Sequence, residues 1–298
     1  MGPRRTRRTR RRPRLGQIEL LSHPDFAVLH PTGSHPESQE RLAVLLGELE
    51  WRDVKPAPEE ALERCHTRAY VERVRSITEL TWLDHDTPCT ESSYRAGLLA
   101  AGAAIAAAER GGFALVRPPG HHALPDRAMG FCLFDSVAVA ARHMQAKRGV
   151  ERLAIVDWDV HHGNGTQAIF WDDPTVLYVS IHQWPFYPGT GAPGEGNETT
   201  VNVPLPAGCG DAEWLRAFER RVEPAVRAFE PELVLVSAGF DGHIADPLAD
   251  MRLTGEGFRE LASRSRALAP AVAAVLEGGY NPPALPGLVR AALEGFTK

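Results

Sequence analysis

The feature that most constrains the fold is the regular alternation of short apolar runs with longer helical patterns. The apolar runs are Phe113–Val116, Leu153–Val156, Val176–Ser180, Leu233–Val236 and Val272–Leu276. The helical patterns between them are Ser92–Arg110, Val137–Lys147, Trp214–Phe229 and Gly257–Leu268. The first of these patterns is followed by Gly111-Gly112, a helix-stop signal. Continuous apolar strands that alternate with helices predict a parallel sheet covered by helices on both faces.

Length and composition fit one large domain with a substantial core. The chain has 298 residues, of which 43% are hydrophobic, and a single α/β domain can reach roughly 250 residues. No apolar run approaches the ~20 residues that span a bilayer, so we expect a soluble protein without a membrane partner. The four cysteines show no CxxC spacing, which argues against a disulfide scaffold or a thiolate zinc site. A reducing cytoplasm is therefore the expected location.

Charge is concentrated at the N-terminus. Eight of the 33 basic residues are arginines within the first 14 positions, which leaves 25 basic residues against 38 acidic ones. We predict that residues 1–16 form a basic, disordered tail and that residues 17–298 form a single catalytic domain. A basic arm could instead bind nucleic acid or an acidic surface. The acidic remainder of the chain is a poor nucleic-acid clamp, so no direct nucleic-acid partner is expected.

Each apolar run leads into reactive or loop-forming residues. The segments that follow the runs are RPPGHHA (Arg117–Ala123), Asp157–Gln167, Ile181–Gly191, SAGFD (Ser237–Asp241) and EGGYN (Glu277–Asn281). Ligands bind beyond the carboxyl ends of the strands in sheets of this kind. Five strand ends that carry His, Asp and Tyr therefore predict one active site along one edge of the sheet.

The Asp157–His161 segment has the spacing of a metal site. Asp157, Asp159 and His161 share one face of an extended chain, and Asp241 could supply a further carboxylate from another strand end. Such a group needs a cation to offset its repulsion and desolvation. A catalytic divalent metal fits, with Zn²⁺ as the first expectation and Fe²⁺ as the second. The alternative is a structural hydrogen-bonded cluster of Asp and His.

Two further strand ends carry candidate catalytic side chains. His121 and His122 follow Pro118-Pro119-Gly120 and could serve as a general base and its acid or electrostatic partner. Tyr280 follows two glycines, and its hydroxyl could polarise a carbonyl opposite a metal. The alternatives are surface histidines in a loop and a tyrosine that only packs.

An ordered set of motifs resembles a known family. The motifs are RPPGHHA, GFCLFD (Gly130–Asp135), DWDVHHGNGT, PGTG (Pro188–Gly191), SAGFD, ADP (Ala245–Pro247) and LEGGYN. From about His23 onward the chain resembles the zinc-dependent histone deacetylase superfamily. It looks closest to the class II-like bacterial branch, which includes acetylpolyamine amidohydrolases and acetoin-utilisation proteins. The resemblance implies an α/β fold of the arginase/deacetylase type, a three-layer αβα sandwich with a mostly parallel sheet of about eight strands.

The resemblance also implies roles for single residues. Zn²⁺ would bind Asp159, His161 and Asp241, and Tyr280 would polarise the acetamide carbonyl together with the metal. The inner histidine, His121, would pair with Asp157, and the outer one, His122, with Asn164. A structural K⁺ would be held by Asp157, Ser180 and the backbone of Asp159 and His161. The residues matching the substrate tunnel are Phe131, Tyr187, Gly130, Leu248 and Gly279, and Arg41 matches an arginine of an internal channel.

Four positions depart from the pattern of the family. Asp135 and Ser136 replace the usual Asn-Asn. Leu248 occupies a gatekeeper position at which a glutamate marks one polyamine-selective member, so the apolar side chain favours acyl-lysine. His243 occupies a position that is Asp in the related two-metal arginase-like enzymes, and it could contact a second metal or simply line the rim.

The function expected from these observations is metal-dependent removal of acetyl groups from amines. The first expected substrate is acetyl-lysine in a protein or peptide, and the alternative is an acetylpolyamine or another small amide. A two-metal ureohydrolase is disfavoured because Asp241-Gly242-His243 replaces the expected Asp-x-Asp. A non-catalytic binding protein is disfavoured by the complete set of metal and histidine residues.

Overall fold

The computed structural model describes residues 18–297. The basic tail predicted for residues 1–16 therefore lies outside the described residues. Within residues 18–297, no helix is both long and apolar enough to cross a membrane. All four cysteines are buried and free.

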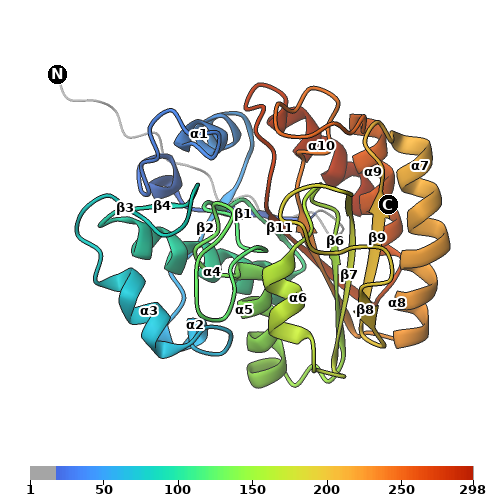
Figure 1. The fold of residues 1–298 in the computed structure, drawn as a ribbon, viewed down its shortest axis with the longest axis horizontal. Coiled ribbons are helices and arrows are strands. Elements are labelled where there is room, and N and C mark those ends of the chain that lie inside the picture. The colour runs from blue at the N-terminus through green and yellow to red at the C-terminus, as the bar shows by residue number, and fades with distance from the viewer. Residues whose placement is uncertain (1–17, 298) are drawn as a thin grey trace.

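A nine-stranded sheet forms the centre of the described structure (Figure 1). Its strand order is β2-β1-β5-β11-β10-β6-β7-β9-β8, and every neighbouring pair is parallel except β8 with β9. The strands are β1 (Leu20–Ser22), β2 (Arg52–Asp53), β5 (Phe113–Ala114), β6 (Leu153–Asp157), β7 (Val176–Gln183), β8 (Gly196–Asn197), β9 (Thr200–Leu205), β10 (Leu233–Ala238) and β11 (Ala271–Leu276). The predicted parallel sheet is confirmed, with nine strands where about eight were expected.

The five predicted apolar runs are five adjacent strands in the middle of this sheet, β5-β11-β10-β6-β7. Every residue of β6, β7 and β10 is buried, as expected for strands covered on both faces. The register places Asp157 at the end of β6 opposite Ser180 of β7 and Ser237 of β10. The polar segments that follow these strands therefore begin at one edge of the sheet.

Helices cover both faces of the sheet (Figure 1). On one side α4 packs against α5, and on the other α9 packs against α10. The helices are α1 (Gln39–Glu48), α2 (Glu59–Leu62), α3 (Arg68–Arg75), α4 (Ser93–Arg110), α5 (Ser136–His143), α6 (Asn164–Phe170), α7 (Asp211–Ala217), α8 (Glu223–Phe229), α9 (Gly255–Arg266) and α10 (Leu285–Phe296). A short antiparallel hairpin, β3 (Thr81–Trp82) with β4 (Pro88–Cys89), lies apart from the main sheet.

The helix boundaries follow local signals in the sequence. Helix α4 ends at Gly111, which adopts a left-handed conformation with a φ of 67°. Helix α5 begins after Asp135, whose side chain accepts the N–H of Ala138 at 2.9 Å. The predicted helix Trp214–Phe229 consists of most of α7, a π-helical segment at Phe218–Val222 and α8.

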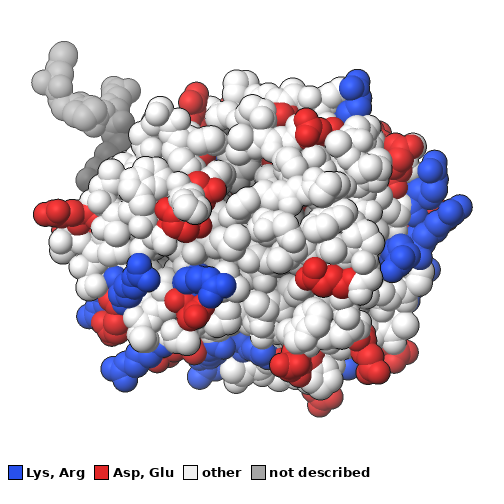
Figure 2. Space-filling model, in the orientation of Figure 1, with Lys and Arg blue, Asp and Glu red and all other residues white. Residues whose placement is uncertain are grey.

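Charged side chains are scattered over the face of the molecule shown in Figure 2. They lie mainly around its periphery, where acidic and basic groups are interspersed, and the middle of that face is largely uncharged. This face therefore lacks the basic stripe that is typical of a nucleic-acid clamp.

Candidate active site

Asp159, His161 and Asp241 form a compact group of metal-ligating side chains. Nδ1 of His161 lies 3.2 Å from Oδ1 of Asp159 and 3.0 Å from Oδ2 of Asp241. One ligand atom from each residue lies within 4.8 Å of the others, and all three residues are buried. The expected ligands therefore lie together although they come from segments after two different strands, β6 and β10.

Backbone N–H groups hold the two carboxylates in place. Val160 donates to Oδ1 of Asp241 at 3.0 Å, and Gly278 donates to Oδ2 of Asp159 at 2.8 Å. A Cβ atom at residue 278 would lie 2.2 Å from Oδ2 of Asp241, closer than real contacts allow. Glycine is therefore required at position 278, where the backbone after β11 approaches the carboxylates.

The electrostatics of this group favour a bound cation. Although burial opposes it, His121 and His161 hold the pKa of Asp159 well below its usual range. Burial and the charge of Asp159 raise the pKa of Asp241 to about 6. Burial disfavours a charged His161, but hydrogen bonds to the two carboxylates raise its pKa to about 9. Two buried carboxylates thus draw positive charge to this point, and oxygen and nitrogen donors of this kind fit a catalytic Zn²⁺ or Fe²⁺.

Each histidine of the pair has its expected partner. Nδ1 of His121 lies 3.1 Å from Oδ2 of Asp157, and Nδ1 of His122 lies 2.8 Å from Oδ1 of Asn164. The two ring centroids are 4.1 Å apart, and the His122 and His161 centroids are 6.0 Å apart. The histidine pair therefore lies beside the metal-ligating group.

The two histidines have opposite tendencies to hold a proton. Burial lowers the pKa of His121, but the charges of Asp159 and Asp157 outweigh burial and raise that pKa well above its ordinary value. Burial and the rings of His121 and His161 lower the pKa of His122 well below its ordinary value. Neighbouring titratable groups whose pKa values are shifted in opposite directions are characteristic of acid–base sites.

Tyr178 contacts Asp157, the partner of His121, but was not identified from the sequence. Its hydroxyl donates a hydrogen bond of 2.9 Å to Oδ2 of Asp157, the oxygen that also lies beside His121. The residue lies within an apolar run and looked like core. Its position two residues before Ser180, hence on the same face of β7, was the signal that could have found it.

Glu277 was also missed. Its Oε2 accepts the N–H of Gly120 at 2.6 Å and the N–H of His121 at 3.2 Å, which ties the histidine loop to the end of β11. Its Oε1 is buried and has no hydrogen-bond partner among the described residues. Burial raises the pKa of Glu277 to about 8. A carboxylate placed directly after an apolar strand was the available signal.

Tyr280 is held by backbone and ring contacts. Its N–H donates to Oδ2 of Asp246 at 2.6 Å, and its ring lies 5.6 Å from that of Phe131 in a perpendicular arrangement. The guanidinium of Arg41 lies 4.9 Å from the centroid of the Tyr280 ring. Arg41 also donates to the carbonyl of Gly279 at 2.7 Å, so it lies directly behind the tyrosine.

Arg41 belongs to a fully buried ion network. Its guanidinium lies 3.2 Å from Glu37, and Arg117 lies 2.8 Å from the same carboxylate. A further Arg41 hydrogen bond reaches the carbonyl of Glu277. The network thus joins α1, the segment after β5 and the segment after β11.

Aromatic rings surround the histidines and the candidate ligands. The Tyr187 ring lies 5.3 Å from His122 and is 38% exposed, whereas Phe186 stacks on His161 at 5.3 Å. Gly130 has a φ of 56°, and a Cβ there would lie 2.5 Å from the His122 ring. Leu248 is half-buried, and its N–H donates to Oδ1 of Asp246 at 3.0 Å. Of the expected tunnel residues, Tyr187 and Gly130 therefore lie directly beside His122.

The hydrogen-bond partners of three other residues that the sequence singled out can be named. Oγ of Ser180 lies 2.9 Å from Nδ1 of His182, and Ser180 pairs in register with Asp157. His243 is not part of the metal-ligating group, and its Nδ1 accepts the N–H of Ala245. Asp135 accepts the Thr166 hydroxyl at 2.7 Å, and burial raises its pKa to about 7.

Comparison with known proteins identifies the family. The histone deacetylase domain model matches residues 35–296. The chain belongs to the histone deacetylase family. Its sequence is 38% identical over 312 residues to a probable deacetylase from Archaeoglobus fulgidus, covering 93% of this chain and 86% of that protein. It is 40% identical over 285 residues to the histone deacetylase-like amidohydrolase of Pseudomonas aeruginosa, covering 87% of this chain and 75% of that protein.

Two further similarities support the family membership. The polyamine deacetylase HDAC10 of Homo sapiens is 39% identical over 302 residues, covering 88% of this chain and 45% of that protein. The crystal structure of the HDA15 HD domain superposes with a TM-score of 0.89 at 35% identity, covering 95% of this chain and 88% of that one. This histone deacetylase family member is therefore a hydrolase with the deacetylase fold, and acetylated compounds are its class of substrate.

Proposed function

We propose that this deacetylase uses a Zn²⁺ ion bound by Asp159, His161 and Asp241 to hydrolyse acetylated amines, with acetyl-lysine side chains of proteins or peptides as its substrates. The observation that carries the proposal is the close group of three buried ligand atoms beside a histidine pair with opposed pKa shifts. Fe²⁺ is the alternative ion, because oxygen and nitrogen ligands suit both metals.

The bound metal would supply Lewis-acid polarisation and a more acidic water. His122 is held neutral, so its free ring nitrogen accepts the proton of the attacking water. His121 stays protonated against Asp157 and offsets the negative charge that develops on the acetyl carbonyl. The proton held by His122 then moves to the departing nitrogen, which leaves as the free amine while the acetyl group leaves as acetate.

Tyr280 is proposed to stabilise the developing oxyanion. Its ring is fixed by Phe131 and Arg41, and its backbone by Asp246. A hydroxyl held in a buried site costs little reorganisation when charge develops on the substrate. Its role is therefore to donate a hydrogen bond to the carbonyl oxygen in the transition state.

We further propose that a K⁺ ion binds between Asp157, Ser180 and the carbonyls of Asp159 and His161. Asp157, the last residue of β6, is the register partner of Ser180 within β7, which brings the two residues side by side. Such an ion would offset the buried charge of Asp157 behind the histidine pair.

The aromatic walls suit a narrow, extended substrate. Phe131 and Tyr187 contact Tyr280 and His122 respectively, which is consistent with an alkyl chain passing between aromatic rings to reach the site. Water exclusion by such walls strengthens the interactions of the reacting groups. Leu248, which matches the gatekeeper position of the family, would add an apolar side chain at the entrance and favour the uncharged stem of acetyl-lysine.

One observation favours an acetylpolyamine as the second candidate substrate. Asp84 and Asp86 line a surface recess of about 230 Å³, together with Arg127 and Tyr187, so carboxylates outnumber the one guanidinium there. A cationic amine could lie against these carboxylates while its acetylated end occupies the tunnel.

The four free cysteines are consistent with action in a reducing cytoplasm.

Turnover on matched substrates tests the proposal. The Zn²⁺-loaded protein is assayed on an acetyl-lysine peptide and on acetylated putrescine and spermidine, with a hydroxamate chelator as the control. We expect chelator-sensitive cleavage of the peptide. Cleavage of the polyamines alone would assign the enzyme to small-molecule metabolism, and failure on all substrates with Zn²⁺ bound would contradict the proposed reaction.

A further inference from the structure

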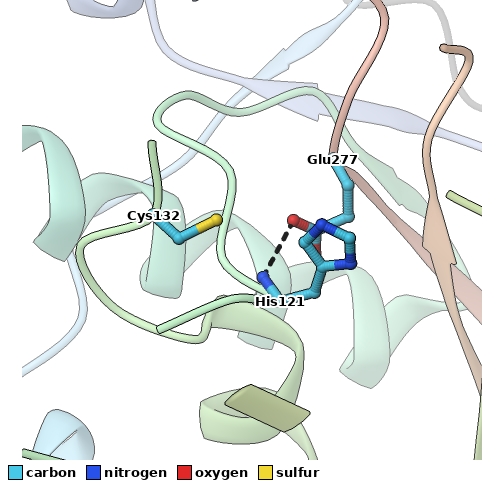
Figure 3. A group of neighbouring side chains, drawn as sticks. All are labelled: His121, Cys132 and Glu277. Atoms are coloured by element: carbon cyan, nitrogen blue, oxygen red, sulfur yellow. Dashed lines mark hydrogen bonds between the residues drawn. The ribbon is translucent and has the colours of Figure 1, made fainter. Parts of the chain in front are cut away.

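A second group of buried metal-ligating side chains lies next to the histidine pair. Cys132, His121 and Glu277 are all buried, and one ligand atom from each lies within 4.8 Å of the others. Figure 3 shows the Cys132 sulfur and the Glu277 carboxylate directed toward each other beside the His121 ring. None of these residues belongs to the Asp159, His161 and Asp241 group.

The carboxylate of this second group has unused binding capacity. Oε2 of Glu277 accepts two backbone N–H groups, but Oε1 is buried without a hydrogen-bond partner among the described residues. The thiol of Cys132 donates to the carbonyl of Gly130 at 3.3 Å, and the backbone N–H of His122 is placed to hydrogen-bond the sulfur when it is a thiolate. A buried polar atom left without a partner is costly, so a ligand that engages Oε1 would be stabilised.

The donor types point to a thiophilic divalent cation. Thiolate, imidazole and carboxylate are the three ligands found in protein zinc sites, and a sulfur ligand disfavours Mg²⁺ and Ca²⁺. A thiolate and a carboxylate together offset the charge of a divalent ion, so the occupied group would be neutral overall. Tetrahedral coordination would bring the ligand atoms closer than 4.8 Å by small side-chain movements.

We propose that Cys132, His121 and Glu277 form a second, inhibitory binding site for Zn²⁺ or a similar thiophilic divalent cation. On binding, the Cys132 S–H bond breaks, its proton passes to solvent and a sulfur–metal bond forms. The protons of the charged His121 ring and of the Glu277 carboxyl also pass to solvent, and a ring nitrogen of His121 gives its lone pair to the ion, which occupies that nitrogen beside the proposed reaction centre. No oxidation or reduction is involved.

The second site binds more weakly than the first. His121 lies 3.7 Å from Oδ1 of Asp159, so ions in the two groups would be near neighbours and would repel each other. Burial also favours the protonated forms of Cys132 and Glu277, which an ion at this site must displace, so we expect the second ion to bind after the first and inhibition to appear at a higher metal concentration than activation. This consequence for activity rests on the proposed function, whereas the binding itself does not.

Cobalt spectroscopy measures metal binding at the second site independently of enzyme activity. A thiolate bound to Co²⁺ gives a near-ultraviolet charge-transfer band, and the ligands Asp159, His161 and Asp241 include no sulfur. We expect no such band with the first equivalent of Co²⁺ added to the metal-free protein and a clear band with the second. Cys132→Ser should abolish the band and keep the first equivalent, whereas the matched buried-cysteine control Cys65→Ser should keep both.

Zinc titration of turnover supplies the functional readout. Excess Zn²⁺ should inhibit the wild-type enzyme, and Cys132→Ser should need at least tenfold more Zn²⁺ for the same inhibition. If Cys132→Ser does not fold, Cys132→Ala is used in its place, because alanine removes the sulfur ligand without burying a hydroxyl. A missing thiolate band at the second equivalent, or equal inhibition of the Cys132 variants, would overturn the inference. A spectroscopically intact second site in an inactive enzyme would instead count against the proposed function.

Discussion

The hydroxyl of Tyr178 donates a hydrogen bond of 2.9 Å to Oδ2 of Asp157. The same oxygen lies 3.1 Å from Nδ1 of His121, so one carboxylate oxygen serves two neighbours on two different segments. The orientation of the inner histidine thus depends on a tyrosine in the middle of β7, in addition to its own loop.

Replacing Tyr178 with Phe should lower kcat about threefold to tenfold and leave KM nearly unchanged. The change removes one hydrogen bond to a charged group, worth roughly 1.5–3 kcal/mol, but the contact of Asp157 with His121 and the buried ring remain, so we expect only about 0.7–1.4 kcal/mol of this to be lost in the transition state. Steady-state kinetics with a metal assay on the same preparation measure the effect. Tyr94→Phe, on α4, is the matched control. A loss of bound metal in Tyr178→Phe would show that the tyrosine supports the ligands instead.

Tyr280→Phe should reduce kcat by about 10²-fold or more while Zn²⁺ remains bound. The phenyl ring keeps the contacts with Phe131 and Arg41 but cannot donate to the oxyanion. Turnover of the preferred substrate, compared at equal metal content, tests this. Wild-type turnover in this variant would exclude the proposed oxyanion role.

His122→Ala should also cost about 10²-fold or more in kcat, because the neutral ring is the proposed proton acceptor. The metal ligands do not include His122, so the metal content should stay at the wild-type level. A low kcat with wild-type metal content per chain indicates loss of acid–base catalysis, whereas a low kcat with low metal content indicates loss of the metal site. An active variant would transfer the acid–base role to His121.

Asp241→Asn should weaken Zn²⁺ binding by more than about 100-fold. Losing a direct metal ligand costs more affinity than losing a residue that only hydrogen-bonds to a ligand, which costs about 10- to 100-fold. Competition with a chromophoric chelator measures the affinity. Asp246→Asn is the matched control, since Asp246 is a nearby buried carboxylate that accepts the N–H of Tyr280 and belongs to no ligand group. Equal affinities in the two variants would remove Asp241 from the ligand set.

Asp135→Asn should stabilise the protein at pH 8 but not at pH 4. Burial raises the folded-state pKa of Asp135 from 3.8 to about 7. Between these values the folded state binds a proton that the unfolded state has lost, so the contribution to stability falls as the pH rises. Asparagine keeps the cap on Ala138 and does not titrate.

Thermal unfolding of both proteins between pH 4 and pH 8 tests this dependence. The Tm difference should grow in favour of the variant as the pH rises through this window, then level off above about pH 7. Asp126→Asn, at an exposed aspartate, should track the wild type throughout. A pH-independent difference would show that Asp135 is not held protonated.

The sequence predicted those parts of the fold that leave a periodic or compositional signal. The long buried strands β6, β7 and β10 were found because each begins with four consecutive apolar residues. The edge strands β2 and β8 have only two residues each and show no period, so the number of strands was underestimated.

The candidate site was predictable where polar residues directly follow a strand, as with Asp159, His161 and Tyr280. Tyr178 was missed because an aromatic residue inside an apolar run looks the same whether or not its hydroxyl has a partner. The buried contacts of Glu37 with Arg117 and Arg41 could not be predicted either, since they join segments that no local pattern relates.

The hydrogen bond from Arg41 to the carbonyl of Gly279 joins residues 238 positions apart in the chain. During synthesis on a ribosome, the arginine emerges long before the glycine exists. Until then, the Arg41 guanidinium lacks the carbonyl that orders the backbone before Tyr280. The reaction centre of this deacetylase is therefore completed late in biogenesis, and a nascent chain released short of Gly279 would carry the histidine pair and the candidate metal ligands without the residues that close the site around them.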